Sequence, residues 1–207
     1  MFTKQIIQIL KKTYPNAHCS LDFKTPLELL AATILSAQCT DERVNKVTRE
    51  LFQKFPSVSA YAKADIKDIE LAVFSTGFYK NKAKAIQQSA RIVLEKFNGA
   101  VPHTMDELLQ LSGVARKTAN VVLGNAFGIV QGVVVDTHVS RIAGRLGWTR
   151  EKNPVKIEQD IMARIPKKNW LAISHLLIAH GRKTCTARKP FCATCPLNKF
   201  CPAAFNI

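Results

Sequence analysis

The fold of this chain is decided by one stretch, which runs Leu111-Ser112-Gly113-Val114-Ala115-Arg116-Lys117-Thr118-Ala119-Asn120-Val121-Val122-Leu123. A helical segment from Met105 to Gln110 precedes it, and the apolar residues of its second half recur at the spacing of one buried helix face. The stretch therefore predicts two helices joined by a tight turn. Gly113 has no Cβ, so the main chain can turn there and come close to a ligand, and the free N–H groups that open the second helix form an anion site. In a basic protein the obvious anion is a nucleic-acid phosphate.

The chain carries a large excess of positive charge. Its 207 residues include 30 Lys and Arg against 15 Asp and Glu, which gives a formal net charge of +15. An excess of this size commonly marks a polyanionic partner. A basic surface that only confers solubility is the alternative. It is disfavoured because the basic residues are interleaved with helical segments instead of forming a tail.

Composition bounds the class of protein. With 47% hydrophobic residues, the chain can bury one sizeable core or two small ones. No apolar run reaches the roughly 18 residues that span a bilayer, and the segment from Met1 lacks the apolar core of a signal peptide. We therefore expect a globular cytoplasmic protein without membrane contact.

Apolar periodicity and capping signals predict on the order of ten helices and no sheet, so the expected fold class is all-α. Thr25-Pro26-Leu27-Glu28 is a capping box with proline at the first helical position. A long helix is expected from about Lys82 to Phe97, and a later one is expected to end at Gly181. The run Val133-Val134-Val135 is too short for a useful strand. We interpret it as a buried, extended lead-in to Asp136, the N-cap of the next helix.

Four of the six cysteines lie within the last 23 residues. Their spacing is Cys185-x6-Cys192-x2-Cys195-x5-Cys201. Four soft thiolates in one short loop suit either a zinc ion or an iron–sulfur cluster. Only the middle pair is as close as structural zinc usually requires, and the wide outer spacings let the loop wrap a larger object. A secreted disulfide scaffold is disfavoured because Cys19 and Cys39 stand alone, and four incidental thiols are equally unexpected in a cytosolic chain.

The hairpin stretch, the segment Val133-Val134-Val135-Asp136-Thr137-His138 and the cysteine spacing together resemble the endonuclease III family of DNA base-excision glycosylases, over nearly the whole chain. One departure is Ala115, where the family's hairpin usually carries a second glycine. The resemblance implies a two-domain helix-hairpin-helix DNA glycosylase fold. Residues 22–131 would form a helical-barrel domain with the hairpin, and residues 1–21 plus 132–207 a helical domain with the cluster. It also implies a DNA cleft between them and a structural 4Fe-4S cluster on Cys185, Cys192, Cys195 and Cys201.

The resemblance further implies a catalytic pair. Lys117 aligns with the family's Schiff-base lysine, and Asp136 aligns with the carboxylate that deprotonates it or stabilises positive charge at the sugar C1′. The implied enzyme is a bifunctional DNA glycosylase/AP lyase, which removes oxidised pyrimidines and then cleaves 3′ to the abasic site by β-elimination. Taken alone, the residues have plainer interpretations: most lysines of basic proteins only face DNA, and Asp136 is first a helix cap. Adenine-mismatch enzymes of the same superfamily lack this lysine.

Two further residues are expected to enter the DNA stack. Gln38 lies at a break between helices and aligns with the residue that stands opposite the extruded nucleotide, although a lone glutamine is usually a solvated amide. Phe78 lies in a loop with a glycine, a second aromatic residue and two lysines, Lys80 and Lys82. Such a loop can push a ring into the stack while the lysines hold flanking phosphates. Burial preferences alone would place an aromatic side chain in the core.

The remaining expected DNA contacts are to the backbone. Gly113 and Ala115 would approach a phosphate at the hairpin, and Lys189 lies in a basic cysteine loop that can clamp one. The expected partner is double-stranded DNA that contains damaged bases or abasic sites, bound by a monomer that is nucleoid-associated when on DNA.

Two other classes of function remain open. A non-catalytic DNA-binding module could use the same hairpin, and Lys117 with Asp136 argues against it. An electron-transfer protein would be favoured by a lack of DNA affinity, but no second cluster site is suggested. No motif marks the base pocket, so the sequence leaves the preferred lesion open.

Overall fold

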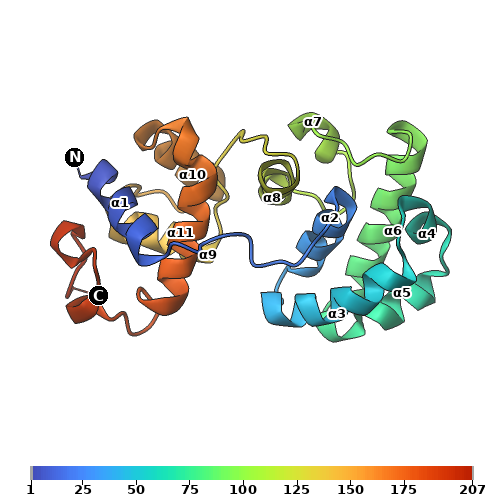
Figure 1. Cartoon of the computed structure of the whole chain (residues 1–207), viewed down its shortest axis with the longest axis horizontal. Coiled ribbons are helices and arrows are strands. Elements are labelled where there is room, and N and C mark those ends of the chain that lie inside the picture. The colour runs from blue at the N-terminus through green and yellow to red at the C-terminus, as the bar shows by residue number, and fades with distance from the viewer. Residues whose placement is uncertain (1, 207) are drawn as a thin grey trace. The chain divides into compact units, whose positions relative to one another are not determined.

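The computed structural model describes residues 2–206, and all the regular secondary structure in that range is helical (Figure 1). The predicted all-α class is therefore confirmed. The α-helices are α1 (Thr3–Thr13), α2 (Pro26–Leu35), α3 (Asp41–Lys54), α4 (Val58–Lys63), α5 (Ile66–Val73), α6 (Tyr79–Lys96), α7 (Met105–Leu108), α8 (Arg116–Ala126), α9 (Thr137–Arg145), α10 (Pro154–Arg164) and α11 (Trp170–Lys183). Short 3-10 turns are η1 (Phe74–Thr76), η2 (Lys167–Asn169), η3 (Cys192–Thr194) and η4 (Asn198–Phe200).

Side chains cap most of the helix starts, as the sequence indicates. Thr25 accepts a hydrogen bond from the Glu28 N–H at 3.2 Å, with proline in the first position of α2, so the predicted capping box is confirmed. Thr40, Ser57 and Asp65 accept equivalent bonds at the starts of α3, α4 and α5. Each cap gives a short helix a defined start, so several short helices can follow one another closely along the chain.

The contacts divide the chain into two compact units, of which one is the continuous segment Ser20–Gln131. It contains α2 to α8, and its longest helix, α6, packs against α2, α4 and α5 (Figure 1). Its largest fully buried side chains are Leu29, Leu35, Leu51, Tyr61, Ile69, Leu108 and Leu123. The hairpin stretch belongs to this unit.

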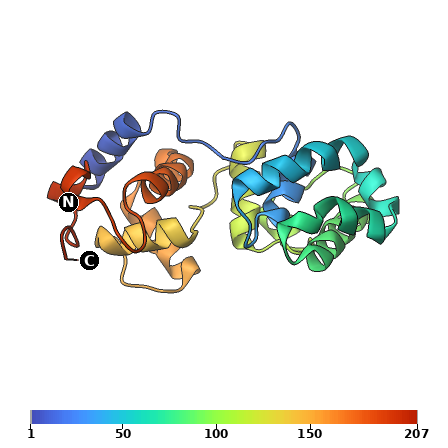
Figure 2. The same cartoon turned by 90° about the horizontal axis from the view of Figure 1, so that it is seen from below.

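The other unit combines both ends of the chain, up to Cys19 and from Gly132 onward. Figure 2 shows the N-terminal helix α1 beside the C-terminal segment, and the rings of Phe2 and Phe200 lie 5.2 Å apart. The core of this unit is built from α1, α9, α10 and α11, with Ile6, Ile7, Leu10, Val139, Ile142, Ile157, Ile161, Ile173 and Leu177. The assignment of residues 22–131 and of 1–21 plus 132–207 to functional domains stays a prediction.

Two helix boundaries differ from the sequence-based expectations. The long helix α6 begins at Tyr79 instead of Lys82, because Phe78 adopts a left-handed conformation (φ 48°) directly before it. Gly181 does not end α11 but lies inside it, where an added Cβ would stand 2.7 Å from Nδ1 of His138. That glycine therefore serves the close approach of α9 and not a helix terminus.

The segment Val133–Val135 is buried and has no strand structure, so the expectations of burial and of no strand are confirmed. The N–H of Val134 donates to Ser174 Oγ of α11 at 3.0 Å, which satisfies a buried donor outside any sheet. Within residues 2–206 no helix combines the length and the apolar character needed to cross a membrane.

Candidate functional site

The turn of the hairpin is closely packed at Gly113. Its φ is +74°, and an added Cβ would lie 2.9 Å from Cβ of Ala85 in α6. The neighbouring Ser112 carbonyl accepts from Ser89 Oγ at 2.8 Å, and the Ser112 hydroxyl donates to Gln88 at 2.9 Å. Glycine is therefore required here both for the backbone conformation and for the contact with α6.

Ala115, the departure from the family's hairpin, has an ordinary extended conformation. Its φ of −98° and ψ of 172° are open to any residue, its side chain is exposed, and no side chain caps α8 at this end. The backbone of this turn therefore does not need a second glycine. The start of α8 keeps the character of an anion site, since the N–H groups of a first turn have no partners within their helix.

Lys117 is the second residue of α8, and its side chain is exposed. Gln38 and Phe78 are exposed as well, and both have left-handed backbones, with φ of 52° and 48°. Phe78 exposes 64% of its surface, so the alternative that its ring belongs to the core is wrong. All these residues belong to the Ser20–Gln131 unit.

Lys82 differs from the expectation that it holds a phosphate. Its side chain is only 5% exposed, and its ammonium donates to the carbonyls of Leu35 and Thr76, each at 2.8 Å. The earlier start of α6 turns this side chain inward, whereas Lys80 remains exposed. Lys82 therefore cannot reach solvent-side phosphates.

Asp136 lies in the other unit and is the N-cap of α9. Its carboxylate accepts from the Val139 N–H at 2.8 Å, which confirms the predicted cap. The side chain is partly exposed, so a second role at its free oxygen is sterically open. Lys117 belongs to the Ser20–Gln131 unit, so the two members of the expected pair lie in different units.

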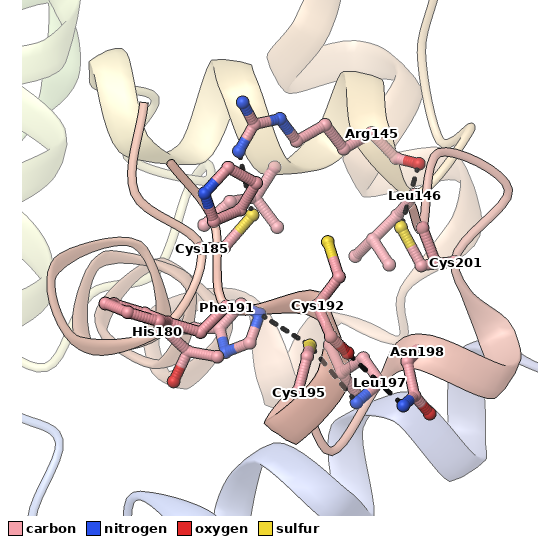
Figure 3. Close-up of a pocket in the computed structure, with 14 residues that line it drawn as sticks. Arg145, Leu146, His180, Cys185, Phe191, Cys192, Cys195, Leu197, Asn198 and Cys201 are labelled. Carbon is pink, nitrogen blue, oxygen red and sulfur yellow. Dashed lines mark hydrogen bonds between the residues drawn. The ribbon is translucent and has the colours of Figure 1, made fainter. Parts of the chain in front are cut away.

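The four clustered cysteines line one pocket (Figure 3). Its apolar wall comes from Ile142 of α9, from Leu146 directly after that helix, and from Leu197. No three His, Cys, Asp or Glu side chains of residues 2–206 gather closely enough to hold a single metal ion. Four thiols that line one pocket are a donor set that suits a zinc ion or an iron–sulfur cluster.

Hydrogen-bond donors approach the sulfurs from several elements. The Arg145 guanidinium donates to Cys185 Sγ at 3.1 Å, and the Leu197 N–H lies 3.4 Å from Cys195 Sγ (Figure 3). Nε2 of His180 lies 3.7 Å from the same sulfur. Burial lowers the pKa of His180 to about 4, with a further lowering by the Arg141 cation, so this imidazole is neutral at physiological pH.

Helix α9 connects Asp136 to the cysteine loop. Arg141 donates to the carbonyls of Gly181 and Cys185, at 3.2 Å and 2.9 Å. One turn later Arg145 also donates to the carbonyls of Thr186 and Ala187. Helix α9 therefore carries the candidate carboxylate at its start, and its arginines hydrogen-bond to the cysteine loop at its end.

Lys189 is exposed in that loop, where its carbonyl accepts from the hydroxyl of Thr186 at 2.7 Å. An exposed ammonium in this loop can contact a phosphate. Sequence reasoning missed the structural roles of Arg141, Arg145 and His180, and it assigned Lys82 to a phosphate contact instead of a buried one. None of them has a spacing motif, and only the folded contacts reveal their positions.

Comparison with known proteins agrees with this arrangement. Residues 31–167 match the family model described as "HhH-GPD superfamily base excision DNA repair protein". The fold and the hairpin thus define a helix-hairpin-helix protein of base-excision DNA repair. The relatives narrow this class.

Endonuclease III of Synechocystis sp. is 57% identical over 200 residues, which is 97% of this chain and 91% of the relative. Endonuclease III of Escherichia coli K12 is 38% identical, over 95% of this chain and 93% of the relative. The chain belongs to the endonuclease III family.

Two solved structures share the fold across the whole chain. A non-covalent endonuclease III–DNA complex superposes with a TM-score of 0.93 at 43% identity, covering 100% of this chain and 98% of that one. A trapped endonuclease III–DNA covalent intermediate gives the same TM-score and identity, covering 100% and 99%.

Proposed function

We propose that this member of the endonuclease III family is a bifunctional DNA glycosylase/AP lyase that removes oxidised pyrimidines from duplex DNA. The observation that carries the proposal is similarity over the full chain to endonuclease III, including a trapped covalent complex with DNA. The exposed lysine of the hairpin, Lys117, would supply the amine for such a covalent bond.

The proposed reaction starts at the sugar of an extruded nucleotide. The neutral amine of Lys117 attacks C1′, and the bond from C1′ to the base breaks, so that the base leaves with the bonding electron pair. The sugar ring opens to give an imine with Lys117. Loss of a proton from C2′ then expels the 3′ phosphate by β-elimination, and water releases the lysine. No oxidant or reductant is needed.

Asp136 is proposed to take the proton from Lys117 or to stabilise positive charge at C1′. Its carboxylate already accepts the Val139 N–H, which fixes its orientation at the start of α9. The second lone pairs of the carboxylate remain available, so capping and proton transfer are compatible in one side chain.

The proposed duplex contacts divide into insertion and backbone contacts. Gln38 would fill the space left by the extruded nucleotide, and Phe78 would act as a wedge at the neighbouring step. Gly113 and Ala115 would present N–H groups to a phosphate, and Lys189 would hold another. The exposure of all five residues supports these roles.

The cysteine pocket is proposed to hold a 4Fe-4S cluster on Cys185, Cys192, Cys195 and Cys201. The arrangement of four sulfurs around a pocket, with N–H donors to two of them, fits such a group. The cluster would be structural, because all four ligands belong to the segment after α11 and would hold together the loop that carries Lys189.

Borohydride trapping tests the nucleophile. Reduction during turnover should convert the imine into a stable protein–DNA adduct whose modified peptide contains Lys117. Lys117→Ala should abolish the adduct and retain most of the affinity, because one lost phosphate contact among several weakens binding only modestly. Arg116→Ala is the matched control, since it removes a charge from the same turn and keeps the amine. An adduct from Lys117→Ala at the wild-type rate would locate the nucleophile elsewhere.

Asp136→Asn separates capping from chemistry in the same assay. Asparagine still accepts the Val139 N–H, so the fold and the duplex affinity should persist. The rate of adduct formation should fall by about a hundredfold or more if the carboxylate moves the proton. An unchanged rate would leave Asp136 with the cap alone.

A further inference from the structure

Lys82 is a buried cation whose two hydrogen-bond partners are both main-chain carbonyls. It lies in the first turn of α6 with 5% of its surface exposed, and Nζ is 2.8 Å from the oxygens of Leu35 and Thr76. Burial lowers the pKa of Lys82, and the nearby Cys39 opposes that shift. Burying an ammonium carries a desolvation penalty, so its position requires a compensating role.

The two carbonyls end the elements that lead to Gln38 and Phe78. Leu35 is the last residue of α2, three residues before Gln38, and Thr76 is the last residue of η1, two residues before Phe78. Carbonyls at the end of a helix lack partners within that helix and lie at its negative pole. One ammonium therefore satisfies a carbonyl at each of these two ends and links them.

Gln38 and Phe78 are both held in the left-handed region, at φ of 52° and 48°, although neither is glycine. Their side chains are exposed, so burial of their own surface does not stabilise these conformations. Such backbone strain persists only where the surrounding structure determines it, and it is concentrated at functional sites. The Lys82 link is one part of that surrounding structure.

The same face of α6 also supports the hairpin turn. Lys82, Ala85 and Ser89 have the i, i+3, i+7 spacing of one helix face. Ala85 lies against Gly113, and Ser89 donates to the Ser112 carbonyl at 2.8 Å. One helix thus holds three segments, of which two are joined through the Lys82 ammonium.

We propose that Lys82 is a positioning residue that fixes Gln38 and Phe78 relative to each other, so that both side chains enter a duplex as one unit. The inference rests on the proposed DNA contacts of these two residues. Without the ammonium, the end of α2 and the turn before α6 move independently. Extrusion of a paired base then loses the concerted insertion, whereas chemistry at Lys117 does not change.

The test measures the Lys82→Met variant on two substrates. Methionine has an unbranched side chain of similar length and lacks the charge and the hydrogen-bond donors of lysine. One substrate is a duplex with a paired oxidised pyrimidine next to 2-aminopurine, and the other is a single strand with an abasic site, which has no stack to open. On the duplex, the single-turnover rate and the 2-aminopurine fluorescence rise should fall, the rate by roughly ten- to a hundredfold. On the single strand the rate should stay within about twofold of wild type, which is within the scatter of an unperturbed site.

Gln87→Met is the matched control. Gln87 is another buried donor of α6, 6% exposed, and its amide donates to the Ala64 carbonyl at 2.8 Å, beside α4. It should lower the thermal midpoint without a selective loss on the duplex. Lys82→Gln, which keeps an uncharged donor, should give an intermediate duplex rate, and it keeps the comparison possible if Lys82→Met does not fold.

Coupling between the inserted residues decides the proposal. The effects of Gln38→Ala and Phe78→Ala on the duplex rate should be non-additive in the wild type and additive in the Lys82→Met background. Equal losses by Lys82→Met on both substrates, or coupling that survives it, would overturn the positioning role. If Gln38→Ala and Phe78→Ala individually leave the duplex rate unchanged, the proposed DNA contacts fail, and the inference fails with them.

Discussion

Gly113 offers a direct measure of how tightly the hairpin is held. Gly113→Ala must place an L-residue at φ +74° and bring its Cβ to 2.9 Å from Ala85. We expect a loss of about 2 kcal/mol or more in the free energy of unfolding, from the left-handed conformation and from overpacking together. Duplex binding should weaken as well, because the phosphate-facing turn is displaced. Chemical denaturation and a binding titration measure the two effects.

Gly128 supplies the control for that substitution. Its φ is +68°, and no atom lies within 4 Å of an added Cβ, so Gly128→Ala isolates the backbone term. It should cost about 1 kcal/mol and leave duplex binding unchanged. If Gly113→Ala and Gly128→Ala lose the same stability and the same affinity, the contact between α6 and the turn has no role in DNA binding.

At single residues, the sequence predicted what local patterns encode. The Thr25 cap, the Asp136 cap and the need for glycine at position 113 follow from rules that span only a few positions. The buried position of the Lys82 side chain could not be predicted, because its partners Leu35 and Thr76 become neighbours only after folding. The role of Gly181 was misjudged for the same reason, since the approach of His138 has no signal near residue 181.

At the level of elements, α9 and the cysteine loop should act as one structure. Cys192→Ser removes a ligand, whereas Arg145→Met removes the donors to Cys185 Sγ and to two loop carbonyls and leaves every ligand. The wild type should be brown, with iron and acid-labile sulfide. Both variants should retain less iron, and Arg145→Met should lose it faster to a chelator, because residues that hydrogen-bond to metal ligands commonly contribute about ten- to a hundredfold in metal affinity.

Arg150→Met is the control for that prediction, because Arg150 is an exposed arginine outside α9. Its iron content and rate of iron loss should match the wild type. Stoichiometric zinc without visible absorbance in the wild type would rule out the cluster. Wild-type iron retention by Arg145→Met would show that the loop holds its ligands without help from α9.

The positions of helices can be predicted where capping residues and apolar periodicity agree. A helix boundary cannot be predicted where a residue with a strained backbone sets it. The sequence predicts a start of α6 near Lys82, because nothing in it shows that Phe78 adopts a left-handed conformation. The spacing of the four cysteines favours an iron–sulfur cluster over a zinc ion. Their arrangement around one pocket is seen only in the folded structure.

At the level of the whole molecule, the net charge of +15 predicts a steep dependence of DNA affinity on salt. If Lys189 contacts a phosphate, Lys189→Ala should lower the slope of log affinity against log salt by about one. Lys54→Ala is the control, because Lys54 is paired with Asp68 at 2.9 Å. An unchanged slope for Lys189→Ala would place that lysine outside the footprint. Fluorescence anisotropy over a salt series measures the slope.

Composition could not distinguish one core from two, and the two-domain prediction came from the family resemblance. The reason is that one unit joins distant ends of the chain, and hydrophobic periodicity carries no information about which helices meet. The apolar face of α1 predicts burial and does not predict that α11 packs against it.

That split unit also has a consequence for synthesis. On the ribosome α1, with Ile6, Ile7 and Leu10, emerges well before α11 and Phe200, against which its unit packs. At roughly 5–20 residues per second, the wait lasts on the order of ten to forty seconds. Every residue of the Ser20–Gln131 unit is available within that interval. The nascent chain can therefore complete the hairpin before the helix at its own beginning finds its partners.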